Sequence, residues 1–238
     1  MYNRLHNKKI LITAGPTKEA IDPVRYISNH SSGKMGYAIA EKLLEKGAQV
    51  CLISGPVNIH LEHPRLKIVR VTSASEMYLA CCKVFEDVDI AIFAAAVADY
   101  RPEKVAEKKI KKDESHFTIR MIKNVDIAYE FGRVKTHKQI SVGFALETDD
   151  EIKHAIGKLD KKNFDMVILN SINNSNAALG YDTNKITIIK NDFSKKEFSF
   201  KNKTEVAKDI VNEIAATLSA HEKYQLEETV LDYETMYR

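Results

Sequence analysis

The 238-residue sequence lacks the features that mark secreted, membrane-spanning and nucleic-acid-binding proteins. Its three cysteines, Cys51, Cys81 and Cys82, form no CxxC pair, which argues against a disulfide framework and predicts reduced thiols. No apolar run approaches the ~20 residues of a membrane helix, and the N-terminus has no apolar signal core. The formal charge of +3 is close to neutral for this length, so nucleic acid is not expected as the main partner. These absences together predict a soluble, cytoplasmic protein.

Two familiar phosphate-binding motifs are also absent. The dinucleotide fingerprint GxGxxG does not occur. A Walker loop requires Ser or Thr after its lysine, but Lys34 is followed by Met35, and no glycine stands five residues before Gly33. A nucleotide bound by this chain would therefore be held by a loop of another kind.

The chain does contain an alternation of apolar, strand-like runs with amphipathic, helix-like segments. Strands are expected at residues 10–14, 49–53, 66–71, 89–96, 117–121, 140–145 and 164–169, helices at 35–46, 75–85, 125–134, 149–162 and 205–218, and a hairpin from 186–189 and 197–200. This order predicts an α/β fold with a Rossmann-like, doubly wound, mainly parallel sheet, helices on both faces and a small C-terminal β-hairpin. We expect a single domain over residues 1–218. The charged tail, 219–238, receives no structural prediction.

The stretch around which the chain is organised is GPTKEAIDPVRYISNHSSGKMG, residues 15–36. It follows the first strand and ends where the first helix begins, so its small residues and free backbone N–H groups form an anion-binding arrangement. The connection is much longer than the usual length of about 2–6 residues, which favours a functional loop. Residues 95–100 leave from the same carboxyl edge of the sheet, where ligands bind in this architecture.

Five ordered motifs resemble those of the phosphopantothenoylcysteine synthetases: residues 15–36, AAVADY at 95–100, KIKK at 109–112, MIKN at 121–124 and GFALET at 143–148. The resemblance covers roughly residues 8–215. It implies a ligase of coenzyme A biosynthesis that activates 4′-phosphopantothenate with a nucleoside triphosphate and then joins it to L-cysteine. In many bacteria this enzyme is the C-terminal half of a fusion with a flavin decarboxylase, and we expect a free-standing synthetase here.

The resemblance assigns the substrate side of the site to a few residues. Asn29 matches the asparagine that hydrogen-bonds the phosphopantothenate chain, and Arg25 matches an arginine on a flap that crosses a dimer interface. Ala95 and Ala96 keep a strand end small beside the substrate. Lys109 aligns with the lysine of the second half-reaction, in a Lys-rich segment, 101–116, that is expected to be a lid. Without the resemblance, a turn asparagine, core alanines and a solvated charged loop are ordinary explanations.

The resemblance also predicts a nucleotide site. Lys158 and Lys162 are four residues apart, so on a helix they share one face, although solvated surface lysines are a close alternative. Phe144 would pack against the base, and the start of the helix at 125 would offer backbone N–H groups. Many bacterial members have proline where this chain has Val125. The predicted nucleotide-binding residues are Ser31, Ser32, Gly33, Lys34, Asp99, Lys109, Val125, Asp126, Ile127, Ala128, Phe144, Lys158 and Lys162.

The implied nucleotide is CTP, with ATP less favoured, and the implied metal is Mg²⁺, whose ligands the sequence does not assign. A homodimer and a functional link to a separate decarboxylase are further implications. Two alternatives remain open from the residues themselves. An NAD(P)-binding reductase shares the layout, although GxGxxG is missing and Ile53-Ser54-Gly55 stands where an acidic residue would end the second strand. A non-catalytic nucleotide or phosphopantetheine sensor would have the same fold.

Overall fold

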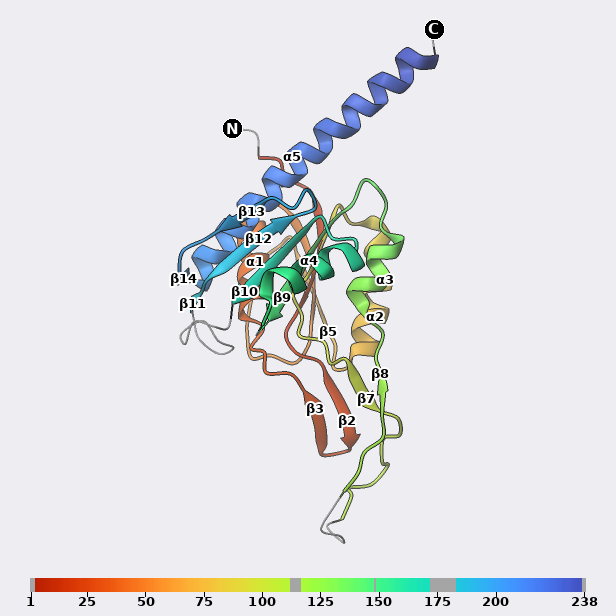
Figure 1. Cartoon of the computed structure of the whole chain (residues 1–238). Coiled ribbons are helices and arrows are strands. Elements are labelled where there is room, and N and C mark those ends of the chain that lie inside the picture. Colours follow the sequence, from red (N-terminus) through yellow and green to blue (C-terminus); the bar gives the residue numbers. More distant parts are fainter. Residues whose placement is uncertain (1–2, 112–116, 148, 172–182, 237–238) are drawn as a thin grey trace.

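An eight-stranded sheet forms the centre of the protein (Figure 1). The computed structural model describes residues 3–111, 117–147, 149–171 and 183–236. The sheet order is β13-β12-β10-β9-β6-β1-β4-β5, and every neighbouring pair from β5 to β10 is parallel. Its strands are β1 (Lys9–Ala14), β4 (Gln49–Ser54), β5 (Leu66–Arg70), β6 (Ile90–Phe93), β9 (Ile140–Glu147), β10 (Met166–Ser171), β12 (Ile186–Lys190) and β13 (Lys195–Glu197). The predicted doubly wound, mainly parallel sheet is confirmed.

Both faces of the sheet are covered by helices, as the apolar strands predict. In β1, Ile10 and Ile12 point into one core and Leu11 points into the other, which is why consecutive residues of this strand are all apolar. The first core lies under α1 (Lys34–Glu45) and α5 (Lys203–Met236), which pack against each other. The second core lies under α2 (Ala74–Cys82), the short 3₁₀ helix η1 (Phe85–Asp87), α3 (Ile127–Val134) and α4 (Glu151–Lys161).

The predicted C-terminal hairpin is confirmed, with its second strand shifted toward the N-terminus. β13 ends at Glu197 and pairs antiparallel with β12, whereas the expected strand covered 197–200. The turn decides the register, because Phe193 takes a left-handed backbone conformation and the N–H of Lys190 donates to the carbonyl of Ser194 at 3.0 Å.

The last helix is longer than the sequence indicated. α5 runs to Met236, although a helix ending at 218 was expected, and its C-terminal part projects from the body of the molecule (Figure 1). The amphipathic pattern ends near Leu218 because only the first part of α5 packs on the core. Across the described parts of the chain, none of the helices combines the length and apolar character needed to cross a membrane.

Two antiparallel arms extend from the carboxyl edge of the parallel strands (Figure 1). One is the hairpin of β2 (Lys18–Asp22) and β3 (Arg25–Ser28), which the sequence analysis treated only as a long loop. The other joins β7 (Tyr100–Pro102) to β8 (Met121–Lys123). The strand expected at 117–121 is wrong, because residues 117–120 are not in a strand and pairing begins at Met121. Both arms start beside the edge at which a ligand is expected.

Two short strands, β11 (Thr183–Asn184) and β14 (Lys201–Asn202), pair with each other, and β14 directly precedes α5. Of the segments named in the sequence analysis, residues 112–116 of the lid, Thr148 and residues 237–238 of the tail lie outside the described residues.

Candidate functional site

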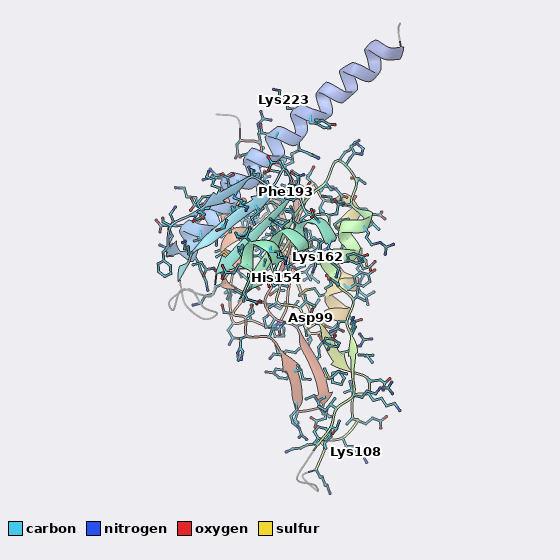
Figure 2. The ribbon with its side chains drawn as sticks, viewed as in Figure 1. Asp99, Lys108, His154, Lys162, Phe193 and Lys223 are labelled. Carbon is cyan, nitrogen blue, oxygen red and sulfur yellow. The ribbon has the colours of Figure 1, made fainter. Side chains whose placement is uncertain are left out.

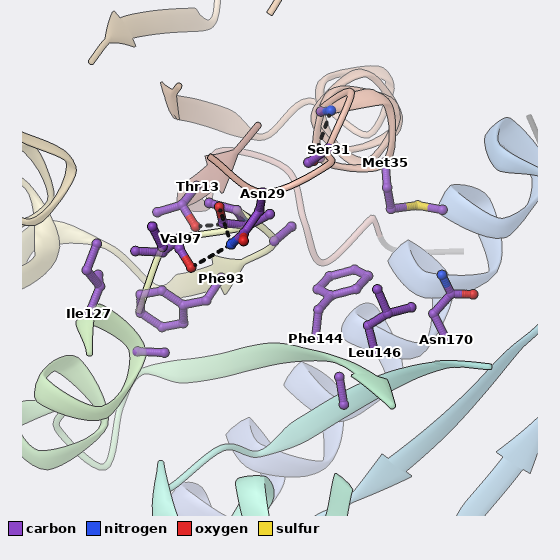
Figure 3. Close-up of a pocket in the computed structure, with 18 of the residues that line it drawn as sticks. Thr13, Asn29, Ser31, Met35, Phe93, Val97, Ile127, Phe144, Leu146 and Asn170 are labelled. Atoms are coloured by element: carbon purple, nitrogen blue, oxygen red, sulfur yellow. Dashed lines mark hydrogen bonds between the residues drawn. The ribbon is translucent and has the colours of Figure 1, made fainter. Parts of the chain in front are cut away.

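A cavity of about 410 Å³ opens at the carboxyl edge of the sheet, between the start of α1, the segment after β6, the start of α3 and the end of β9 (Figure 3). It is lined by the predicted site residues Asn29, Ser31, Ser32, Gly33, Lys34, Ala95, Ala96, Asp99, Val125, Asp126, Ile127, Ala128, Phe144, Lys158 and Lys162. These residues come from five separate stretches of sequence. The fold therefore brings them together at the edge where parallel α/β sheets bind ligands.

Asn29 ties the first arm to the segment that follows β6. Its Nδ2 donates to the carbonyl of Val97 at 3.0 Å and to that of Ala96 at 3.3 Å (Figure 3). Both amide hydrogens are thus directed at the backbone, and the carbonyl oxygen of the side chain is left as an acceptor. Because Asn29 is exposed, a ligand in the cavity can reach that oxygen.

The start of α1 is suited to binding an anion. Gly33 precedes the helix with φ 75°, and a Cβ there would lie 2.9 Å from Val57 Cγ1. A Cβ on Gly36 would lie 2.6 Å from that of Ala14, so the glycine lets the helix approach β1 closely. Among the described residues, no side chain caps α1 and no acidic residue occupies its first turn. The start of α1 lines the cavity, so the positive end of the helix dipole faces the place where phosphate oxygens are expected.

The segment after β6 lines one side of the cavity, and its backbone is held by hydrogen bonds to two threonines. The N–H of Ala95 donates to Thr13 Oγ1 at 3.3 Å, and the N–H of Ala98 donates to Thr17 Oγ1 at 3.0 Å. The N–H of Ala96 donates to the carbonyl of Gly15 at 2.9 Å. β6 was expected to continue through this segment, but it ends at Phe93 because the chain turns toward β1 and makes these bonds instead. The sequence analysis missed Thr13 and Thr17; polar residues at the end of an apolar strand were the available signal.

Asn124 is a second brace that the sequence analysis quoted within a motif but gave no role. Its Nδ2 donates to the carbonyl of Ala98 at 2.8 Å, and its backbone N–H donates to the carbonyl of Asp99 at 2.8 Å. Its Oδ1 accepts from Arg101 Nη1 at 2.9 Å. Asn124 therefore fixes the backbone that carries Asp99 to the start of α3.

Lys158 of α4 and Lys162, the residue directly after α4, are both paired with carboxylates at the cavity. Lys158 Nζ lies 2.6 Å from Glu147 Oε1, and Lys162 Nζ lies 2.9 Å from Asp126 Oδ1. Figure 2 shows Lys162 and His154 on the same side of the molecule as Asp99. Both lysines line the cavity although Lys162 lies one residue beyond the helix, and a nucleotide would have to compete with Glu147 and Asp126 for these ammonium groups. Glu147 was part of a quoted motif and had received no role.

Two further polar residues line the cavity at strand ends. Asn170, near the end of β10, has a buried Oδ1 without a hydrogen-bond partner among the described residues. Asn184 lies beside it in the lining and is itself buried. Neither residue was predicted, and an asparagine at the end of an apolar run was the only signal in the sequence.

Arg25 and Lys109 do not line the cavity. They lie together in a separate, shallow hollow on the arms, with Val24, Ile110 and Lys111. Figure 2 shows Lys108, the neighbour of Lys109, at the far end of the arm and away from Asp99. Arg25, which the resemblance placed at the substrate, and Lys109, which it placed in the second half-reaction, thus lie apart from the other predicted site residues within one chain.

Comparisons with known proteins agree on a family. Residues 5–218 match the family described as the DNA/pantothenate metabolism flavoprotein C-terminal domain. A cysteine/cysteine sulfinic acid decarboxylase from an unknown prokaryotic organism is 46% identical over 210 residues, 88% of this chain and 58% of that protein. The coenzyme A biosynthesis bifunctional protein CoaBC of Haemophilus influenzae is 47% identical over 211 residues, 88% of this chain and 52% of that protein.

A solved structure is similar over nearly the whole chain. The crystal structure of the C-terminal domain of a bifunctional protein CoaBC matches with a TM-score of 0.78 and 39% identity, covering 92% of this chain and all of that one. The chain spans a little over half the length of the curated relatives described above.

Proposed function

Because the chain belongs to the DNA/pantothenate metabolism flavoprotein C-terminal domain family, we propose that it is the ligase that joins 4′-phosphopantothenate to L-cysteine in coenzyme A biosynthesis. The observation that carries the proposal is the cavity itself. It gathers an anion-binding helix start, an accessible amide, a narrow backbone wall and two lysines around one space. The decarboxylase name belongs to a longer relative and is not extended to this chain.

The proposed reaction has two steps. The pantothenate carboxylate attacks the α-phosphorus of CTP, which forms an acyl–phosphate bond and releases pyrophosphate. The amine of cysteine then attacks the acyl carbon, the bond to the nucleotide oxygen breaks, and CMP leaves. Neither step needs a nucleophile from the protein, so the site has to orient the reactants and neutralise phosphate charge.

The residues divide between these tasks. The start of α1 and the ammonium group of Lys34 neutralise phosphates, and Lys158 and Lys162 join them when phosphate oxygens displace Glu147 and Asp126. The side-chain carbonyl of Asn29 accepts from an amide of the pantothenate chain. Phe144, half-buried at the cavity, packs against the base, with the backbone at the start of α3 opposite it. CTP is proposed as the nucleotide on the family resemblance alone, with ATP less favoured.

The donor set of the cavity suits Mg²⁺. Asp99 and Asp126 both line the cavity, and Mg²⁺ is commonly held by one or two carboxylates together with substrate phosphates. Within the described residues no cluster of three or more His, Cys, Asp or Glu forms a complete protein site, which agrees with that mode of binding. When bound, Mg²⁺ would offset the charge of the triphosphate.

The arms supply the argument for a homodimer. Large apolar side chains are exposed on them: Val24 (59%), Tyr26 (51%), Tyr100 (48%) and Phe117 (57%). Apolar residues gathered on projecting arms are typical of a protein interface. In such a dimer, the arm of one subunit would carry Arg25 and Lys109 toward the cavity of the other.

The reaction is assigned to the cytoplasm, with a separate decarboxylase acting on its product.

Pyrophosphate release tests the proposal directly. The purified chain is incubated with 4′-phosphopantothenate and Mg²⁺, with CTP or ATP, each with and without cysteine. We expect limited release with CTP alone, which cysteine converts into sustained formation of phosphopantothenoylcysteine. A preference for ATP would correct the nucleotide only. The absence of release with either nucleotide would contradict the ligase and favour a non-catalytic sensor.

A further inference from the structure

Arg25 and Lys109, the two predicted site residues outside the cavity, are connected through the side chain of Asp22. The carboxylate of Asp22 is completely buried (0% exposed), although it lies at the tip of the β2–β3 hairpin. Its Oδ1 accepts from the N–H groups of Val24 and Arg25, each at 2.9 Å. Its Oδ2 accepts from Arg25 Nε at 2.9 Å and from the N–H of Ile110 at 3.1 Å. One carboxylate thus holds the hairpin and the lysine segment together.

Arg25 closes the same network from the other side. Its Nη2 lies 2.7 Å from Asp22 Oδ2 and donates to the carbonyl of Ile110 at 2.6 Å. Both backbone polar groups of Ile110 are therefore bound by Asp22 and Arg25. Lys109 and Lys111, on either side of Ile110, keep their side chains exposed. The network fixes the backbone between the two lysines and leaves the lysines free to act.

The Nη1 group of Arg25 takes no part in this network, and the arginine side chain is 39% exposed. Among the described residues, two N–H groups of the guanidinium therefore remain for a carboxylate or phosphate. Asp22 orients Arg25 without using up its capacity to bind a ligand.

The charge on Asp22 is stable. Burial alone would raise the pKa of Asp22, but hydrogen bonds from Val24, Ile110 and Arg25 outweigh it and hold the pKa below its ordinary value. Removing one of these partners would leave the buried carboxylate without full compensation for its charge, which destabilises a folded protein strongly. Asp22 is thus a buried carboxylate near the end of a projecting arm, and its partners fix the local geometry.

We propose that Asp22 is a positioning residue that holds Arg25 and the Lys109 segment as one unit, so that the substrate-binding arginine and the lysine of the second half-reaction keep a fixed spacing. The roles of Arg25 and Lys109 rest on the proposed function, whereas the physical linkage through Asp22 does not. Two experiments separate the linkage from its consequence.

The linkage is tested by amide hydrogen exchange of peptides covering residues 103–111. Asp22→Asn removes the charge that binds Arg25, and Arg25→Lys removes the bond to Ile110. Each lost bond exposes the Ile110 backbone, so the backbone amides of this segment should exchange about tenfold or more faster in both variants. Glu103→Gln is the matched control, because it removes a carboxylate of the same arm that pairs with Arg120 at 3.4 Å. Exchange in both variants no faster than in Glu103→Gln would overturn the linkage, whatever the activity.

The consequence is tested by measuring the two half-reactions separately. In Asp22→Asn we expect pyrophosphate release without cysteine to fall less than cysteine-dependent product formation, which should fall roughly 10–100-fold, as small misplacements of a catalytic group do. Lys109→Gln alone should slow the second step strongly, to a residual rate that can still be measured, while pyrophosphate is still released. Adding Asp22→Asn to Lys109→Gln should then cost little more in that step, because both changes affect one unit.

The outcomes can be told apart. Equal losses in both half-reactions, or full additivity with Lys109→Gln, would overturn the positioning role and leave Asp22 as a structural residue. No pyrophosphate release by the wild-type protein would contradict the proposed function, and the hydrogen-exchange comparison would still decide the linkage.

Discussion

Asn29 shows how one side chain can serve both the scaffold and a ligand. Its amide nitrogen is bound to the carbonyls of Ala96 and Val97, so the residue cannot rotate without breaking the contact between the first arm and the segment after β6. The remaining carbonyl oxygen is consequently held in one direction. A fixed acceptor of this kind is what the proposed reaction requires beside an amide-rich substrate.

We predict that Asn29→Asp lowers kcat for ligation by about 100-fold or more while the fold is kept. The new carboxylate cannot donate, and it would face two backbone carbonyl oxygens that now lack their donor. Asn191→Asp, at an exposed turn that does not line the cavity, is the matched control. Ligation by Asn29→Asp at the rate of that control would contradict the role of Asn29.

Many of the residues that line the cavity belong to the sequence motifs, because most of these motifs stand at the end of a strand whose position the apolar pattern indicates. They did not predict pairings across the cavity. That Lys158 meets Glu147, and that Lys162 meets Asp126, depends on how α4 lies over β9 and α3. Nor did they separate Arg25 and Lys109 from the rest, because distance along an arm is a property of the folded chain.

At the scale of elements, α5 is fastened to the C-terminal hairpin by one acidic residue. Glu213 of α5 has Lys190 Nζ 3.1 Å from its Oε2 and Lys196 Nζ 2.5 Å from its Oε1. Burial alone would raise the pKa of Glu213, but hydrogen bonds from the two lysines outweigh burial and hold the pKa below its ordinary value. The charged form of Glu213 is therefore favoured by folding.

This pairing predicts an acid-dependent loss of stability. Because the folded pKa lies below the unfolded one, the stabilisation is present above the unfolded value of about 4.3 and is lost as pH falls through the folded value. Glu213→Gln should lower the free energy of unfolding by about 1–2 kcal/mol at pH 7, and the difference from wild type should shrink below about pH 4. Chemical denaturation across that range measures it, with Glu197→Gln on exposed β13 as control. A difference that stays constant with pH would contradict the ionic origin.

The elements that sequence reasoning missed share a physical cause. The β2–β3 hairpin and the β7–β8 arm contain few alternating apolar residues, since they project from the sheet and bury little surface. Their strands are defined by pairing partners and not by periodicity. The strand expected at 117–121 failed for this reason, because its alternation had no partner before Met121. The buried strands, by contrast, are recognisable from composition alone.

At the scale of the whole molecule, the arms decide whether one chain can complete its own site. Arg25 and Lys109 lie with Asp22 and Ile110 at the end of the arms, and the cavity lies at their base. The arms also carry exposed apolar residues such as Tyr26 and Phe117. A two-fold dimer in which arms are exchanged would bury these side chains and bring the arm of each subunit to the cavity of its partner.

Mixing two inactive variants tests this shared site. Asn29→Asp disables a cavity, and Arg25→Ala disables an arm, so each homodimer should be inactive. In a mixed dimer, one cavity receives both defects and the other receives none. After random exchange of equal amounts, ligation should return to roughly a quarter of the wild-type rate, because half of the two-fold dimers are mixed and each has one intact site.

The control for subunit mixing is the double variant Asn29→Asp with Arg25→Ala, mixed with either single variant, which leaves no cavity with both residues intact. One variant carries an affinity tag, so recovery of the untagged variant together with the tagged one shows that mixed dimers have formed before activity is measured. If mixed dimers form and activity does not return, Arg25 acts within its own subunit. In that case the arms would have to fold back onto the cavity of their own subunit. The linkage through Asp22 would keep Arg25 and the Lys109 segment together during this motion. Hydrogen exchange on the arms should then change when substrate is added to a monomeric variant.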